Sequence, residues 1–334
     1  MQGTNYVHSV VRTRLLEKEL LTQVKFEQLI EAEDVASLWR MLETTSYANL
    51  LQHFAYEESE FEQFLTDALQ LAYKEVRSFL DETGYIELLQ LKYDYYNAKV
   101  LIKGKFLEEN LHSLFLPLGR LTTEELKTYL ENLPFKPNKT RLDQAIEKTL
   151  ADFEQYQDPQ RIDLLLDRYY IEHLYDELTL LNLPLFETYL RTKIDFVNLQ
   201  TLLRVQKQER DLAFLREVLL PYGYIEEEKF IFSLQASPAQ IIRNIEKETI
   251  GKYAKHALEI YGETGSIQTL EREMDHYLLA LLDDAKYIHF GPEPLMAYLL
   301  KKEAEVKNLR IVFVSKLNNV PVKRIAQRVR DVYV

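Results

Sequence analysis

The sequence contains no cysteine, and it has only nine glycines and ten prolines among 334 residues. Without cysteine, the chain carries no disulfide framework, no thiolate metal site and no cysteine nucleophile. The shortage of glycine and proline argues against sandwiches, barrels and dinucleotide-binding sheets, because these folds need turn residues at short intervals. It favours long helices that are joined by few turns.

An excess of positive charge and long apolar runs are absent as well. The formal net charge is -12, from 41 basic and 53 acidic side chains, whereas nucleic-acid binding usually needs a basic excess. We therefore expect no nucleic-acid partner. No run of about 18 apolar residues occurs, so no segment is predicted to span a membrane. If the chain works at a membrane, we expect another protein to hold it there, which makes its membrane contact indirect.

Sequence motifs for nucleotide and cofactor binding are also missing. The phosphate-binding loop G-x-x-x-x-G-K-[ST] and the dinucleotide fingerprint G-x-G-x-x-G do not occur in the chain. His173 and Asp176 are spaced to share one face of a helix, but two ligands do not close a metal site. We therefore predict no catalytic residue, no cofactor and no metal site.

Asp283 and Asp284 leave one enzyme class open as an alternative. All-helical isoprenoid synthases of similar length hold Mg²⁺ on a diphosphate through an Asp-Asp-x-x-Asp motif, and Tyr287 stands here in place of the third acid. No second acidic motif answers the first, and octahedral Mg²⁺ binding needs more oxygen ligands than this pair supplies. A Mg²⁺-dependent, isoprenoid-synthase-like enzyme is therefore the weaker interpretation.

Apolar side chains recur at intervals of three and four residues almost throughout the chain, which is the spacing of one helix face. Capping boxes, in which a serine or threonine precedes a glutamate or glutamine by three residues, mark helix starts at Thr122 and Ser237. The sequence therefore predicts an all-α fold. In one such helical stretch, residues 160–181, the apolar stripe consists of Ile162, Leu165, Leu166, Tyr169, Tyr170, Leu174 and Leu178.

The most informative pattern is an internal repeat in which an acid is followed three positions later by asparagine. Residues at these positions share one face of a helix. A buried carboxylate and amide there can fix the helix to a neighbour, because buried polar groups need hydrogen bonds. We interpret the pairs as structural anchors of each repeat, and a repeated ligand site is the alternative. The three pairs are Asp94 and Asn97, Asp195 and Asn198, and Glu305 and Asn308.

A second repeated block confirms the register of the first. Leu116-Pro117-x-Gly119-x-Leu121 follows the first pair, Leu220-Pro221-x-Gly223-x-Ile225 follows the second, and Val320 to Ile325 is a shortened echo after the third. The sequence thus predicts three similar helical domains of about 100 residues each. Their boundaries are 1–115, 116–219 and 220–334. Three copies either adopt pseudo-threefold symmetry or stack as an open solenoid.

Together, these segments resemble the C subunit of prokaryotic V/A-type rotary ATPases, the counterpart of the d subunit in eukaryotic V-ATPases. Tyr6 and the run Val-Val-Arg-Thr-Arg at 10–14 are similar to the opening helix of that family. The segment 94–105 resembles its Asp-x-x-Asn helix that ends in Gly-Lys. E-x-x-N-L-R-I from Glu305, followed by V-P-V-K-R-I from Val320, resembles its closing segment. The resemblance covers nearly the whole chain.

The resemblance implies a funnel of three similar helical domains around a pseudo-threefold axis. It also implies a non-catalytic rotor adapter, a peripheral protein at the cytoplasmic face of a membrane. Such an adapter joins the D and F subunits of the central shaft to the proteolipid ring and transmits torque for ATP-coupled proton or sodium transport. A free-standing all-helical scaffold, which recruits other proteins, is the alternative from a different functional class.

Overall fold

The computed structural model describes residues 6–54, 56–80, 83–107, 111–132 and 138–329. Within these ranges the regular structure is helical throughout and no strand occurs, so the prediction of an all-α fold is confirmed. Contacts between helices divide the chain into two compact units. One unit comprises the described parts of Met1–Ile86 and Asp275–Val334, and the other comprises Glu87–Met274.

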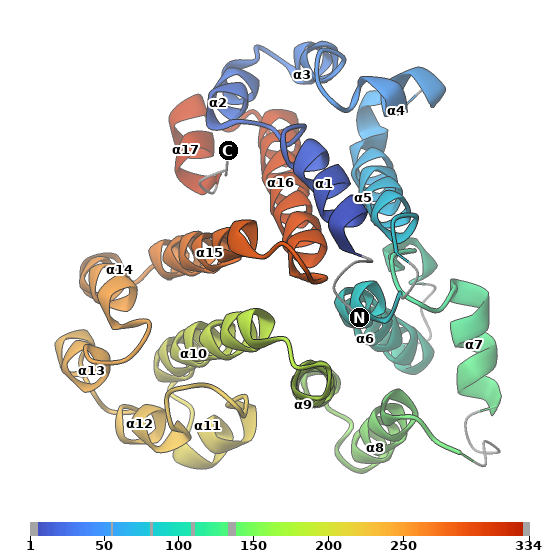
Figure 1. Cartoon of the computed structure of the whole chain (residues 1–334). Coiled ribbons are helices and arrows are strands. Elements are labelled where there is room, and N and C mark those ends of the chain that lie inside the picture. The colour runs from blue at the N-terminus through green and yellow to red at the C-terminus, as the bar shows by residue number, and fades with distance from the viewer. Residues whose placement is uncertain (1–5, 55, 81–82, 108–110, 133–137, 330–334) are drawn as a thin grey trace. The chain divides into compact units, whose positions relative to one another are not determined.

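The first unit is formed by both ends of the chain, which are blue and red in Figure 1. Two long helices, α6 (Gly84–Leu107) and α15 (Gln268–Leu282), each contain a boundary between the units. The remaining elements of the first unit are α1 (Tyr6–Glu17), α2 (Gln23–Glu31), α3 (Val35–Leu42), α4 (Ala48–His53), η1 (Glu58–Glu60), α5 (Phe61–Arg77), η4 (Asp283–Tyr287), α16 (Glu293–Leu317) and α17 (Val322–Arg328).

The second unit contains the chain from α6 to α15. Its other elements are η2 (His112–Leu114), α7 (Thr123–Asn132), α8 (Arg141–Tyr156), α9 (Pro159–Leu181), α10 (Pro184–Lys207), α11 (Leu212–Val218), α12 (Glu227–Phe232), α13 (Pro238–Ile245) and α14 (Gly251–Thr264). Both predicted capping boxes occur. Thr122 and Glu125 bond each other's backbone N–H before α7, and Ser237 and Gln240 do the same before α13.

Helix α16 is the central helix of the first unit, and it packs against α1, α3 and α5 (Figure 1). Its apolar side chains are buried on more than one side, and Leu295, Leu309 and Val312 are fully enclosed. Phe313 lies within an aromatic cluster, with its ring centroid 4.9 Å from that of Trp39 and 5.4 Å from that of Phe61. A helix that is buried on several sides holds its polar side chains in fixed surroundings.

The core of the second unit includes a cluster in which α6 meets α8 and α9. Leu91, Tyr95, Ala98 and Ile102 come from α6. They pack against Leu142, Ala145, Ile146 and Phe153 of α8 and against Ile162 and Leu166 of α9. Ile162 and Leu166 belong to the apolar stripe that the sequence predicts. This packing fixes the face of α6 that carries the first acid–asparagine pair.

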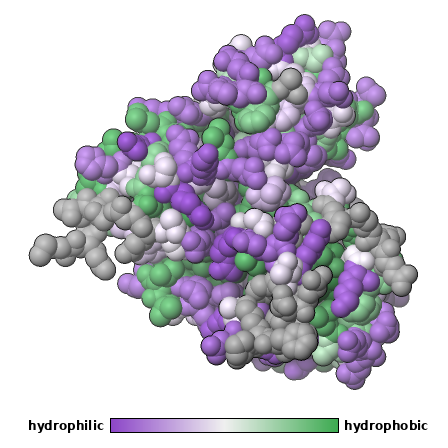
Figure 2. All heavy atoms as spheres, turned by 90° about the vertical axis from the view of Figure 1, so that its right-hand side faces the viewer, coloured by the Kyte–Doolittle hydropathy of each residue, from purple (hydrophilic) through white to green (hydrophobic). Residues whose placement is uncertain are grey.

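No helix within the described ranges is both long and apolar enough to cross a membrane. On the face drawn in Figure 2, hydrophilic residues predominate and the apolar residues between them form separate small groups. The boundaries 1–115, 116–219 and 220–334 stay a prediction, because the division into two units follows contacts between helices and not internal similarity.

Candidate functional site: three buried acid–asparagine pairs

The first pair lies on α6 and binds the backbone of the loop that follows. Asn97 donates from Nδ2 to the carbonyl of Leu116 at 2.8 Å and accepts at Oδ1 from the N–H of the same residue at 2.9 Å. Asp94 accepts at Oδ1 from the backbone N–H groups of Arg120 and Leu121, at 2.8 and 3.3 Å. Both side chains are buried. The pair therefore fastens the loop to the helix at two points.

The second pair repeats this geometry on α10. Asn198 forms the same two bonds with the backbone of Leu220, at 2.8 and 2.9 Å. Asp195 accepts at Oδ1 from the N–H of Ile225 at 2.9 Å. Both side chains are buried here too. In both copies, the loop residues that bond the acid and the asparagine belong to the repeated Leu-Pro-x-Gly block. The two repeated elements of the sequence, the acid–asparagine pair and this block, therefore contact each other.

The glycine of each block lies directly against the acid. A Cβ atom built on Gly119 would come closer than 3.0 Å to Oδ1 of Asp94, and one on Gly223 would come equally close to Oδ1 of Asp195. Cβ atoms in proteins essentially never approach other atoms so closely. The glycine is therefore what lets the loop backbone reach the carboxylate.

The third pair, on α16, takes its partners from the N-terminal part of the chain. Glu305 accepts from the backbone N–H of Leu21, from the hydroxyl of Tyr47 at 2.6 Å and from Nζ of Lys302 at 2.6 Å. The Lys302 ammonium also lies 4.1 Å from the centre of the Tyr47 ring. Asn308 is buried beside it on the same helix. The sequence echo at Val320 supplies none of the bonds described for Glu305.

The N-terminal segment matches the other two loops in its position relative to the next helix. Leu21, Leu121 and Ile225 each offer a backbone N–H to a repeat acid. In every case the next helix, α2, α7 or α12, begins two residues later. The loop partner of the third acid is therefore found near the start of the chain.

The three acids differ in their counter-charges. Nε of Arg120 forms an ion pair with Oδ2 of Asp94 at 2.5 Å, and Lys302 pairs with Glu305. Oδ2 of Asp195 is buried without a hydrogen-bond partner. The nearby guanidinium of Arg191 instead lies 4.1 Å from the centre of the Tyr224 ring. The second repeat is thus the one whose carboxylate has no direct cationic partner.

Burial is the main cause that raises the pKa of Asp195 to about 6. The N–H groups of Ile225 and Tyr224 act in the opposite direction, because they stabilise the charged form. Glu248 raises this pKa further by charge repulsion, and Arg191 lowers it. Burial outweighs the two backbone bonds here because half of the carboxylate is left without a donor.

Two other candidates from the sequence have separate partners. Nδ1 of His173 lies 3.2 Å from the hydroxyl of Tyr95, while Asp176 forms an ion pair with Arg141. Burial and two nearby arginines lower the pKa of His173 to about 4, so the ring is neutral at physiological pH. Over the described residues, no group of three or more metal-binding side chains is arranged to hold an ion.

The aspartate pair of the isoprenoid-synthase alternative is not assembled as a diphosphate site. Asp283 forms an ion pair with Lys301 at 2.7 Å, and Asp284 is exposed on η4. Among the described residues, these two aspartates are not part of any group of three or more side chains that could hold a metal ion. The arrangement gives this alternative no support.

Sequence reasoning missed Leu21, Tyr47 and Lys302, which surround the third acid. The run Leu20-Leu21-Thr22 resembles Arg120-Leu121-Thr122, and in both the threonine caps the helix that follows. This short similarity is the signal in the sequence that could have identified the loop of the third acid. It lacks the proline and glycine that make the other two blocks recognisable.

Comparison with known proteins gives a consistent result over most of the chain. The profile of the ATP synthase (C/AC39) subunit family matches residues 9–328. The C subunit of the V-type sodium ATPase of Enterococcus hirae is 26% identical over 322 residues, which cover 95% of each chain. The C subunit of the A-type ATP synthase of Methanocaldococcus jannaschii is 25% identical over 94% of this chain and 84% of its own length. That of Thermococcus kodakarensis is 26% identical over 92% and 85%.

Proposed function

Because the chain belongs to the ATP synthase (C/AC39) subunit family, we propose that it is the non-catalytic rotor adapter of a V/A-type rotary ATPase. The observation that carries this proposal is the match of the family profile to residues 9–328. The relatives that are named as C subunits support it, because this chain aligns with most of their length. In this role the chain makes and breaks no covalent bond. It connects the part of the machine that handles ATP with the part that moves protons or sodium ions.

The proposed partners are the D and F subunits of the central shaft on one side and the proteolipid ring on the other. The chain would sit at the cytoplasmic face of the membrane as a peripheral protein, with the ring providing its membrane contact. A shaft is narrow and a ring is wide, so torque can pass between them only through a stiff adapter. Long helices with short connections provide that stiffness.

The six repeat residues have a structural role in this proposal. Asp94, Asn97, Asp195, Asn198, Glu305 and Asn308 anchor three similar helical repeats, and they do not bind a ligand. Buried carboxylates and amides that bond loop backbone support such a role, because each bond would be lost if the loop moved away from its helix. Loops held in this way resist deformation under load.

Reconstitution of the complex with and without this chain tests the proposal. Without the chain, the isolated catalytic head should keep its ATP hydrolysis, while ATP-driven ion transport into vesicles should fall to background. Adding the purified chain should restore transport. If the isolated head also loses hydrolysis, the adapter role is wrong.

A tagged pull-down from gently solubilised membranes identifies the partners directly. The D and F subunits and the proteolipid should be recovered in a fixed ratio. Recovery of unrelated proteins in their place would favour the free-standing scaffold, the alternative function from the sequence. The same procedure with membranes that contain the untagged chain serves as the negative control.

A further inference from the structure

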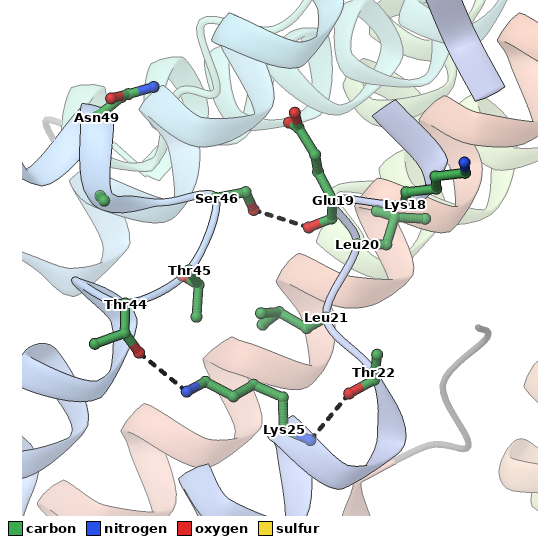
Figure 3. Close-up of a pocket in the computed structure, with 11 residues that line it drawn as sticks. Lys18, Glu19, Leu20, Leu21, Thr22, Lys25, Thr44, Thr45, Ser46 and Asn49 are labelled. Carbon is green, nitrogen blue, oxygen red and sulfur yellow. Dashed lines mark hydrogen bonds between the residues drawn. The ribbon is translucent and has the colours of Figure 1, made fainter. Parts of the chain in front are cut away.

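A polar pocket of about 520 Å³ opens beside the third acid, between the loop that carries Leu21 and the turn that joins α3 to α4 (Figure 3). Its floor includes Leu21, whose N–H is bonded to Glu305. The pocket is open to solvent. The polar groups that matter below are Lys18, Lys25, Thr44, Thr45, Ser46 and Asn49.

Two lysines line this pocket, Lys18 and Lys25, and Lys25 is the one that a hydrogen bond holds in place while it retains free donors. Its Nζ donates one hydrogen bond, to Oγ1 of Thr44 at 3.1 Å, which leaves two of its three N–H groups unused. Within the described parts of the chain, no carboxylate lies within ion-pairing distance of this ammonium. The side chains of Lys18 and Asn49, which also line the pocket, form no hydrogen bond to any described residue.

The acid of the pocket does not neutralise Lys25. In Figure 3 the side chain of Glu19 points away from Lys25, and only its backbone carbonyl faces Ser46. The Glu19 carboxylate lies near Glu75 of α5, where its charge adds to burial in raising the pKa of Glu75. The positive charge of Lys25 is therefore directed into the pocket without an anionic partner among the described residues.

The same local structure occurs a second time in the chain, at α12 to α14. Helices α3 and α13 both have eight residues, and in each copy the next helix begins after five residues of turn. Lys25 is the third residue of α2, and Lys229 is the third residue of α12. Thr45 and Glu248 are each the third residue after the preceding helix.

The two copies differ in the partner of the lysine. In the second copy, Lys229 forms an ion pair with the carboxylate of Glu248. In the first copy, Thr45 stands at the position of Glu248, and Thr44 offers Lys25 only a neutral hydroxyl. The pocket thus lies where the other copy carries its own glutamate side chain.

We propose that this pocket binds the carboxylate of a glutamate or aspartate side chain in an acidic segment of a partner protein. Lys25 receives the carboxylate in the way that Lys229 receives Glu248, and Asn49 donates a second hydrogen bond from the rim. An ion pair at a half-buried lysine is stronger than one at a fully exposed site, because less water screens it.

The surroundings favour a singly charged carboxylate over a phosphate group. The second copy fills the equivalent space with a carboxylate. Glu19, which also lines the pocket, adds negative charge there, so a doubly charged anion would meet stronger repulsion than a singly charged one. This inference requires a partner protein but not the adapter role, so each can fail without the other.

Nuclear magnetic resonance titration of the full-length chain tests the proposal. The probe is an acetylated and amidated peptide with consecutive glutamates, and the matched peptide has glutamine in their place. The glutamate peptide should shift the backbone amide signals around Lys25 and Thr45, and the shifts should weaken as salt is added. The glutamine peptide should leave these signals unchanged.

Two variants test the mechanism. Lys25→Gln should weaken peptide binding about tenfold or more, since the charge-assisted bond is lost. Thr45→Glu should abolish binding while every lysine is retained, because it rebuilds the internal pair seen at Lys229. Lys252→Gln, an equal change of charge at an exposed lysine outside the pocket, should bind the peptide as the unchanged chain does.

Three results would overturn the proposal. One is the absence of shifts around the pocket with the glutamate peptide, and another is equal binding by the Thr45→Glu variant. The third is that inorganic phosphate shifts these signals while the peptide does not, which would make the pocket a phosphate site. Circular dichroism of each variant establishes that it is folded before its binding is compared.

Discussion

Gly119 lies against Asp94 so closely that any side chain at its position would collide with the aspartate: a Cβ atom there would come within 3.0 Å of Oδ1 of the aspartate. The carboxylate cannot turn aside to make room, because backbone N–H groups and Arg120 hold both of its oxygens. The hydrogen bonds of the acid therefore depend on the glycine beside it. Gly223 lies equally close to Oδ1 of Asp195, where that oxygen accepts a backbone hydrogen bond while Oδ2 has none.

Replacing either glycine by alanine should destabilise the chain. We expect Gly119→Ala and Gly223→Ala each to lower the free energy of unfolding by about 2–4 kcal/mol, through crowding and loss of the acid's hydrogen bonds. Urea unfolding followed by circular dichroism measures the change. Gly262→Ala is the matched control, because a Cβ at this position in α14 meets only ordinary contacts. It should stabilise the chain by up to about 1 kcal/mol through helix propensity.

Asn198 should tolerate neither loss of its donor nor gain of charge. Asn198→Asp keeps the acceptor for the N–H of Leu220 but places a carboxylate oxygen against the carbonyl of the same residue. We expect a loss of about 2–4 kcal/mol in unfolding free energy at neutral pH. The same change at the exposed Asn49 should have almost no effect on stability. Equal effects at the two positions would contradict the anchoring role of Asn198.

Asp195 should make the stability of the chain depend on pH between about 4 and 6. Its pKa is about 6 in the folded chain, against an ordinary value of 3.8. In this window the unfolded chain has released the proton while the folded chain still holds it. Stability contributed by this group is therefore present below pH 4 and is lost as pH rises to 6, by about 2–3 kcal/mol.

The variant Asp195→Asn isolates this effect, because the amide keeps the acceptor for Ile225 and does not titrate. Its unfolding free energy relative to the unchanged chain should rise from pH 4 to pH 6 and then level off. A difference that stays constant over this range would show that Asp195 has an ordinary pKa. Asp94→Asn should instead be destabilising at neutral pH, since it breaks the ion pair with Arg120.

The sequence predicts the helices and marks the loops that the first two pairs bind, because the signals for both are local. Three- and four-residue periodicity is a property of each helix by itself. Asn97 and Asn198 reach loops that follow within a few tens of residues, in blocks marked by proline and glycine. Both blocks contain glycine at the same position because the loop backbone must approach the short aspartate side chain closely.

The sequence predicts the third pair but gives no clear mark of the loop that this pair binds, for a physical reason. Glu305 is one methylene longer than aspartate, so the loop backbone does not need to come as close to α16. Glu19 stands in this loop at the position where the other two loops have glycine, so the glycine that would identify the loop in the sequence is missing. Its loop also lies 284 residues away, at the other end of the chain. A repeat compared only in sequence order looks for this loop after α16 and finds Val320.

Lys302 and Glu305 should be coupled strongly, because both side chains are nearly excluded from water. Lys302→Met alone leaves a buried carboxylate that retains only the donors of Leu21 and Tyr47. We expect it to cost about 3–5 kcal/mol in unfolding free energy. The double variant with Glu305→Gln removes both charges and should recover at least half of that loss. Urea unfolding of the two single variants and the double variant gives the coupling energy. Additive losses would mean that the two charges do not stabilise each other, and that the hydrogen bonds of Glu305 to Leu21 and Tyr47 hold the N-terminal loop on α16 without help from Lys302.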